Sequence, residues 1–248
     1  MNIIRNDVLI RRRSRIASIT MIGSLFILAA GMLISFRFPE QYMISFGALI
    51  VGFLLSQIGI SFSNRWGRRP RPDELLDQAL KGLDSKYTLY HYSTPVSHLL
   101  VGPAGVWILL PYYQRGTITY SKGRWHQKGG GLLLGYLKIF AQEGLSRPDI
   151  EVASEVEAIQ KYLSERLPEG QVPAIRAVLV FTNPRAVIDI PEDEEPTAET
   201  LPLAKLKELV RKSKGKGLSP EKAKMIQDAI GILPAKTTEE PAPEEEDK

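Results

Sequence analysis

The chain has three histidines and no cysteine among its 248 residues, which narrows the catalytic and metal-binding chemistry open to it. Without cysteine, disulfides, thiolate metal ligands and a cysteine nucleophile are all excluded. His91, His98 and His126 stand in no HExxH or His-x-His spacing, so a histidine-rich metal site is not expected. No spacing of serine, histidine and aspartate indicates a nucleophilic triad.

The best-placed side chains for chemistry lie on a predicted β-hairpin at residues 97–112. A tight turn at 102–105 pairs the two strands so that Ser97 lies opposite Leu110, with Tyr112 one diagonal step away on the same face. Two carboxylates so placed would share a divalent cation, and a nearby lysine would stabilise the charge that develops. The sequence instead has serine, leucine and tyrosine at these positions, which favours a face that simply packs.

The same stretch, with the order of helices and strands around it, resembles the nuclease-related domain (NERD) family, which looks like a branch of the PD-(D/E)xK nucleases. The family pattern has Asp-His, then Val-Gly-Pro-small-Gly-Val, then a strand ending in Glu-x-Lys, with a glycine and a tryptophan further on. Across roughly residues 73–182, the matching framework residues are His98, Gly102, Pro103, Gly105, Gly116 and Trp125. Ser97, Leu110 and Tyr112 stand where the family has Asp, Glu and Lys, so the resemblance implies degenerate site positions and no catalytic residue.

The resemblance also implies a restriction-endonuclease-like α/β fold, with a mixed sheet flanked by helices, and a prokaryotic cell. Because Mg²⁺ is held mainly through carboxylate and phosphate oxygens, neither Mg²⁺ nor Mn²⁺ is expected as a cofactor in this interpretation. The alternative is a membrane-tethered nuclease that uses Mg²⁺ or Mn²⁺ with relocated residues, such as Lys128, Lys138 and Glu74.

Two uncharged segments, 17–36 and 41–63, are long enough to cross a membrane, since about 20 helical residues span the hydrocarbon core. Only Arg37 to Glu40 separate them, so we predict a transmembrane helical hairpin. A cleaved signal peptide is the alternative for the first segment, but its length and the second span that follows argue against cleavage.

Arginines flank both outer ends of the predicted hairpin. Segments 1–16 and 64–72 carry nine arginines and one aspartate, whereas the connecting loop has one arginine and one glutamate. The positive-inside rule therefore predicts a cell-membrane protein with both termini in the cytoplasm. The membrane-flanking arginines expected beside the anionic inner leaflet are Arg11, Arg12, Arg13, Arg15, Arg65, Arg68, Arg69 and Arg71.

The remainder predicts an α/β domain at residues 73–233, reached through the linker 64–72 and followed by a disordered acidic tail at 234–248. Residues 132–140 are interpreted either as a core-packing segment or as an in-plane contact with the membrane. The expected order is a helix at 72–83, strands at 87–93, 96–101 and 105–113, a hairpin at 116–127, a helix at 149–167, a strand at 172–182, and helices at 201–212 and 219–231.

Residues 73–233 carry 20 basic and 20 acidic side chains, which argues against a nucleic-acid-binding surface. The segment 211–217 is typical of a helix end followed by a glycine loop rather than of a phosphate site. The favoured function is a non-catalytic, membrane-anchored binding or scaffold module with an unidentified protein partner. The alternatives are the nuclease described above and a nucleic-acid binder that does not cleave.

Overall fold

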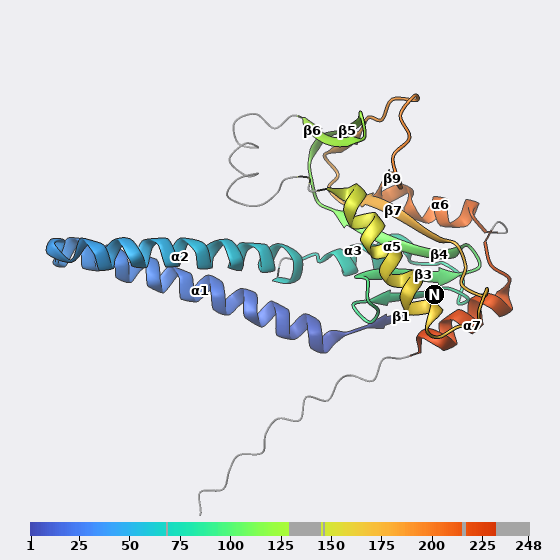
Figure 1. Ribbon diagram of the computed structural model, residues 1–248, viewed down its shortest axis with the longest axis horizontal. Coiled ribbons are helices and arrows are strands. Elements are labelled where there is room, and N and C mark those ends of the chain that lie inside the picture. The colour runs from blue at the N-terminus through green and yellow to red at the C-terminus, as the bar shows by residue number, and fades with distance from the viewer. Residues whose placement is uncertain (68, 129–144, 146, 215–216, 232–248) are drawn as a thin grey trace, which may run out of the picture.

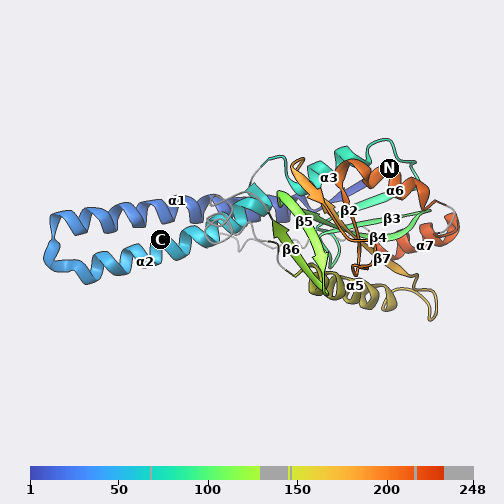
Figure 2. The ribbon, with the colours of Figure 1, turned by 90° about the horizontal axis from the view of Figure 1, so that it is seen from above.

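Two antiparallel helices, α1 (Asp7–Arg37) and α2 (Tyr42–Phe62), lie side by side and project away from an α/β domain (Figures 1 and 2). Both are long and apolar enough to cross a membrane. Large apolar side chains such as Phe26, Leu33 and Phe46 are exposed along them. Helices apolar on their outer surface suit a lipid environment better than water.

The computed structural model describes residues 1–67, 69–128, 145, 147–214 and 217–231. The predictions for Arg68, Lys138, residues 132–140 and the tail 234–248 concern residues outside these ranges.

Helix α2 agrees with the predicted span 41–63, but α1 begins ten residues before the predicted start at residue 17. The Asn6 side chain caps α1 by accepting a hydrogen bond from the Leu9 backbone N–H at 3.0 Å. Residues 7–16, which carry four of the arginines of the predicted basic N-terminus at 1–16, are therefore a helical extension of the predicted span.

The two long helices pack through small residues spaced seven positions apart. A seven-residue period keeps one stripe facing the partner helix, and small side chains let the two backbones approach closely. The Ser45 hydroxyl donates a hydrogen bond across the hairpin to the Gly31 carbonyl at 2.7 Å. The buried small residues of this stripe are Ala17, Ser24 and Gly31 on α1 and Ser45, Gly52 and Gly59 on α2.

A six-stranded mixed sheet in the order β1-β2-β3-β4-β7-β9 forms the centre of the domain. Strand β1 pairs in parallel with β2, with Ile3 opposite Leu89, so the first residues of the chain are part of the domain that was predicted at 73–233. A four-residue strand shows too little alternation to be recognised locally, and its pairing with β2 decides its structure. The strands are β1 (Asn2–Arg5), β2 (Thr88–His91), β3 (His98–Gly102), β4 (Gly105–Tyr112), β7 (Ile175–Phe181) and β9 (Glu199–Pro202).

Helices cover both faces of this sheet, which confirms the mixed α/β architecture. One face packs against α5 (Pro148–Ser164) and α7 (Pro220–Ile230), and the other packs against α3 (Pro72–Leu80) and α6 (Leu206–Lys212). A smaller sheet, ordered β6-β5-β8, stands beside it. Its strands are β5 (Gly116–Ser121), β6 (Arg124–Lys128) and β8 (Ala186–Ile188).

The predicted helix at 201–212 is wrong in its first part. Strand β9 ends at Pro202, a 3-10 turn follows at Leu203–Lys205, and only then does α6 begin. Pairing of β9 with the edge of β7 satisfies backbone groups that a longer helix would have used internally.

The register of β3 and β4 agrees with the prediction, because Val101 pairs with Val106 and Leu99 with Ile108. Ser97 immediately precedes β3, and continuing the same register places it level with Leu110. The end of this hairpin away from its turn is therefore the place where the predicted site positions meet.

Candidate functional site

The helical hairpin meets the domain through a small set of specific contacts. The Trp66 ring lies 4.4 Å from the Tyr92 ring, which lies 4.8 Å from the His98 ring. Arg65 Nη2 donates a hydrogen bond to Ser97 Oγ at 2.7 Å. Tyr92 has a φ of +56°, a left-handed conformation that costs a non-glycine residue about 1–3 kcal/mol and persists only where the surroundings enforce it.

A cavity of about 430 Å³, here named the junction cavity, lies where the hairpin joins the domain. Its size falls within the range of ligand pockets, about 300–1,000 Å³. Ser97, Leu110 and Tyr112 all line it, so the structure brings together the three positions that the sequence placed on one face. The cavity is also lined by Ser61, Asn64 and Arg65 from the hairpin, by Tyr92 and His98 from the sheet, and by Glu151 and Glu155 from α5.

Two of the three predicted site positions are part of the core. Leu110 and Tyr112 are buried in the same apolar cluster as Leu99 and Ile108, and the Tyr112 ring stacks on Phe181 at 5.7 Å. The expectation that this face packs is confirmed for these two side chains. The Tyr112 hydroxyl nevertheless reaches the cavity, where it donates a hydrogen bond to Glu151 Oε2 at 2.5 Å.

Glu151 and Glu155, which the sequence analysis did not single out, supply the carboxylates of the cavity. They stand one helical turn apart on α5, next to the apolar stripe that includes Val152 and Val156. In the sequence, the signal that could have indicated them is a pair of acids at positions i and i+4 that borders the apolar stripe of this helix. Within the described part of the chain, Oε2 of Glu155 is buried and has no hydrogen-bond partner.

Burial, together with the nearby Glu151 carboxylate, raises the pKa of Glu155 to about 7, against the opposing effect of the positive charge of Arg65. A carboxyl group with a raised pKa that lines a cavity is a candidate functional group, because binding and catalytic sites often use burial and neighbouring charges to shift pKa values.

The residues suggested as relocated nuclease groups lie elsewhere. Glu74 accepts a hydrogen bond from the Arg71 backbone N–H at 3.0 Å, at the start of α3, and Lys128 ends β6. Neither side chain lines the junction cavity. Over the described ranges, no group of three or more His, Cys, Asp or Glu side chains is placed to hold a metal ion.

His98 connects the cavity to a buried polar chain. Its Nδ1 lies 2.7 Å from Nδ1 of His91, and Nε2 of His91 lies 3.0 Å from Asp77 Oδ1, while Arg5 pairs with the other Asp77 oxygen. A carboxylate only accepts, so His91 donates through Nε2 and accepts at Nδ1 from His98. Nε2 of His98 is then an acceptor, and burial, reinforced by the charges of Arg65 and Arg5, holds the pKa of His98 well below its usual value.

Asp73 extends this chain on its other side. It is fully buried, lies 3.3 Å from Arg5 Nε and accepts two hydrogen bonds of 3.0 Å from Arg71. We name the set Arg5, Arg71, Asp73, Asp77, His91 and His98 the junction network.

The arginines predicted to flank the membrane have different roles. The Arg71 side chain is only 11% exposed because it binds Asp73 and Glu74, so the expectation of a lipid contact is wrong for this residue. Arg69 is exposed and lies 4.0 Å from Glu74. Arg11, Arg12, Arg13 and Arg15 are exposed on α1, and Arg13 lies over the rings of Phe62 and Trp66.

The remaining framework residues lie away from the junction cavity. Gly102, Pro103 and Gly105 form the β3–β4 turn at the opposite end of that hairpin, where Gly105 has a φ of +116° that suits glycine. Gly116 begins β5 and also has a positive φ.

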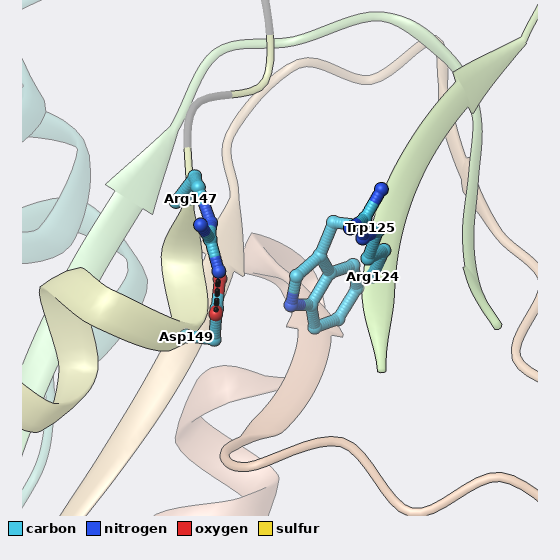
Figure 3. A pocket seen from close by; sticks show the side chains of 4 residues that line it. All are labelled: Arg124, Trp125, Arg147 and Asp149. Atoms are coloured by element: carbon cyan, nitrogen blue, oxygen red, sulfur yellow. Dashed lines mark hydrogen bonds and ion pairs between the residues drawn. The ribbon is translucent and has the colours of Figure 1, made fainter. Parts of the chain in front are cut away.

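Trp125 lines a second, smaller cavity of about 280 Å³ together with Arg124, Arg147 and Asp149 (Figure 3). Arg147 and Asp149 come from the start of α5 and form an ion pair of 3.1 Å, while Trp125 and Arg124 come from β6. Arg147 is paired with Asp149, so two of the charges that line this cavity neutralise each other.

No protein-family model matches this chain, and no curated protein and no solved structure matches it significantly. The geometry of the junction cavity is therefore the main basis for a functional proposal.

Proposed function

We propose that this chain is a two-span membrane protein whose α/β domain is a non-catalytic binding module beside the bilayer. The observation that carries the proposal is the junction cavity, because its walls come jointly from the end of α2 and from the domain. Its positions equivalent to a NERD-type site carry Ser97, Leu110 and Tyr112, which leave neither a carboxylate pair nor a lysine on the sheet. The resemblance to a degenerate NERD domain belongs to this proposal.

Both outer ends of the hairpin meet the domain, since β1 pairs within the sheet and α2 leads into the contacts of Arg65 and Trp66. This arrangement supports placing the N-terminus and the domain on the same side of the membrane. The exposed arginines of α1 then favour the cytoplasmic side, next to the anionic inner leaflet.

Calorimetric titration of Mn²⁺ into the full chain in detergent micelles tests the proposal. The full chain is needed because a fragment that begins at residue 73 lacks β1 and Arg5. We expect no heat beyond dilution at millimolar Mn²⁺ and no cleavage of DNA or RNA. A stoichiometric Mn²⁺ site that Glu151→Gln removes would contradict the proposal.

One observation favours a second candidate, a metal-dependent nuclease with relocated residues. Glu151 and Glu155 reach the cavity beside Tyr112, so two carboxylates are present, although they come from α5 rather than from the sheet. This candidate predicts Mg²⁺ or Mn²⁺ binding and cleavage that are lost in Glu155→Gln. Glu157→Gln, an exposed position on the same helix, is the matched control.

A further inference from the structure

The junction cavity holds charges of both signs. Glu151 and Glu155 come from α5, and Arg65 comes from the hairpin. Arg65 already acts electrostatically on Glu155 and donates a hydrogen bond to Ser97. A small ligand that carries both a positive and a negative group would satisfy both sides, whereas a simple anion or cation would satisfy only one.

The cavity lies at the level of lipid headgroups if α2 spans the bilayer. The 21 residues of α2 end at Phe62, and a helix of that length matches a hydrocarbon core of about 30 Å. Arg65 follows Phe62 by three residues, or about 5 Å at helical rise, which places it within the headgroup layer. Ser61 and Asn64 line the same cavity wall.

We propose that the junction cavity binds the headgroup of a phospholipid that carries a primary ammonium and a phosphate, that is, a phosphoethanolamine-type zwitterion. The proposal rests on the proposed binding function and names its ligand. The ammonium lies between Glu151 and Glu155 and, after a rotation of the Glu155 side chain, donates to its Oε2, which has no hydrogen-bond partner among the described residues. The phosphate pairs with Arg65, and the Tyr112 hydroxyl keeps Glu151 in place.

The same groups select against other common headgroups. An anionic headgroup without an amine brings negative charge towards Glu151 and Glu155 and leaves both acids without a counter-charge. A quaternary ammonium has no N–H donor, so it leaves Oε2 of Glu155 without a hydrogen bond in a buried place. Phosphatidylethanolamine is therefore preferred over phosphatidylglycerol and phosphatidylcholine.

The preference depends on pH in a defined direction. The charged and titratable groups that line the cavity with Glu155 are Glu151 on its own helix, Arg65 from the hairpin, and Tyr92, His98, Tyr112 and Tyr113 from the sheet side. Glu155 binds the ammonium when it is ionised, and its pKa of about 7 means that it is largely protonated at pH 6. Binding therefore strengthens between pH 6 and pH 8.

The test uses the full chain in lipid nanodiscs made from equal parts of phosphatidylethanolamine, phosphatidylcholine and phosphatidylglycerol. Native mass spectrometry then counts the lipids that stay bound after release from the bilayer. We expect retention of phosphatidylethanolamine to exceed that of the other two lipids about tenfold at pH 8, the size of one charge-assisted contact. Glu155→Gln removes most of this preference, and Arg65→Gln lowers the retention of all three lipids because each carries the phosphate, whereas Glu157→Gln keeps both the retention and the preference.

Equal retention of the three lipids, or a preference for phosphatidylglycerol that Glu155→Gln leaves unchanged, overturns the inference. Soluble O-phosphoethanolamine is titrated in parallel, and tight binding of it without lipid retention overturns the assignment to a lipid. Absence of lipid selectivity together with absence of Mn²⁺ binding refutes this inference alone. Mn²⁺ binding with nucleic-acid cleavage refutes the proposed function itself.

Discussion

The junction cavity and the junction network are adjacent polar regions that differ in how completely their buried charged groups are paired. In the network, Asp73 is fully buried and is met by both Arg5 and Arg71, and Asp77 is met by Arg5 and His91. In the cavity, one buried carboxylate oxygen of Glu155 has no hydrogen-bond partner over the described residues. Arg65 donates its hydrogen bond to the neutral hydroxyl of Ser97.

This difference distinguishes polar groups that stabilise the fold from polar groups that are available to bind a ligand. Buried ions that are paired with opposite charges hold elements in place, and here they tie β1, α3 and the sheet together across the junction, although Arg5 Nε makes an ion pair with Asp73 and no hydrogen bond over the described residues. A buried carboxylate oxygen without a hydrogen-bond partner, as Glu155 Oε2 is over the described residues, lowers stability, and a ligand that donates to it would offset that loss. Four substitutions sharpen or break this comparison.

Asp73→Ala has the largest expected effect. Asp73→Ala removes the fully buried carboxylate that Arg5 and Arg71 share and leaves them only their outer partners Asp77 and Glu74, so we expect the free energy of unfolding to fall by about 3–5 kcal/mol. Denaturant titration of the full chain in detergent, followed by tryptophan fluorescence, measures the change. Asp193→Ala, an exposed position in a turn, is the control and changes stability by less than about 0.5 kcal/mol. A loss below about 1 kcal/mol in Asp73→Ala would show that the network adds little to stability.

Glu155→Gln changes stability in the opposite direction. The pKa of Glu155 is about 7 in the folded protein and near 4.5 when unfolded, so the folded state binds the extra proton between these values. Stability of the wild type therefore falls as the pH rises from about 4.5 to about 7. The variant lacks this loss and is more stable at pH 8 by up to about 3 kcal/mol, measured by denaturant titration between pH 5 and pH 8. Identical pH profiles of stability for the variant and the wild type would show that ionised Glu155 does not lower the stability of the folded protein.

His98 belongs to both regions, and its contribution depends on pH. Its pKa is lowered in the folded protein, so below about 6.5 the unfolded state binds a proton that the folded state does not. Stability falls with decreasing pH in that window, by up to about 1.4 kcal/mol for each pH unit from this group. His98→Gln reduces that slope, whereas His126→Gln, at an exposed position on β6, leaves it unchanged. The slope of unfolding free energy between pH 5 and pH 6.5 is the quantity to measure.

Tyr112→Phe has the smallest expected effect. It removes the hydrogen bond to Glu151 and keeps the ring that stacks on Phe181, so stability falls by about 1 kcal/mol. Tyr120→Phe is the matched control, because over the described residues its hydroxyl makes no hydrogen bond and its ring lies 5.0 Å from the Trp125 ring in a tilted arrangement. An equal loss in both variants would indicate that the ring environment, rather than the contact with Glu151, is responsible.

Much of the fold was predictable from local patterns. The second span, the turn at 102–105, the register of Val101 with Val106 and the double-sided burial of β7 all follow from hydropathy, turn residues and chain geometry. Strand β9 and the early start of α1 were not predicted, because a partner strand and a capping contact decide them.

The candidate site was predictable only in part. Ser97, Leu110 and Tyr112 were placed together correctly, since antiparallel pairing relates their positions over a short stretch of chain. Glu151 and Glu155 were missed, because α5 lies far along the chain and only its packing on the sheet brings them to Tyr112.

The sequence by itself determined two apolar segments of bilayer length, the arginines at both outer ends and a β-hairpin whose site positions lack acids. These are properties of composition and short-range spacing, which need no knowledge of the rest of the chain. Tertiary structure alone decided that Arg5 meets Asp73 and Asp77, and that two glutamates enter the junction cavity. Such pairings depend on which distant elements pack together, and the free energy of burying each charge is set only when they do.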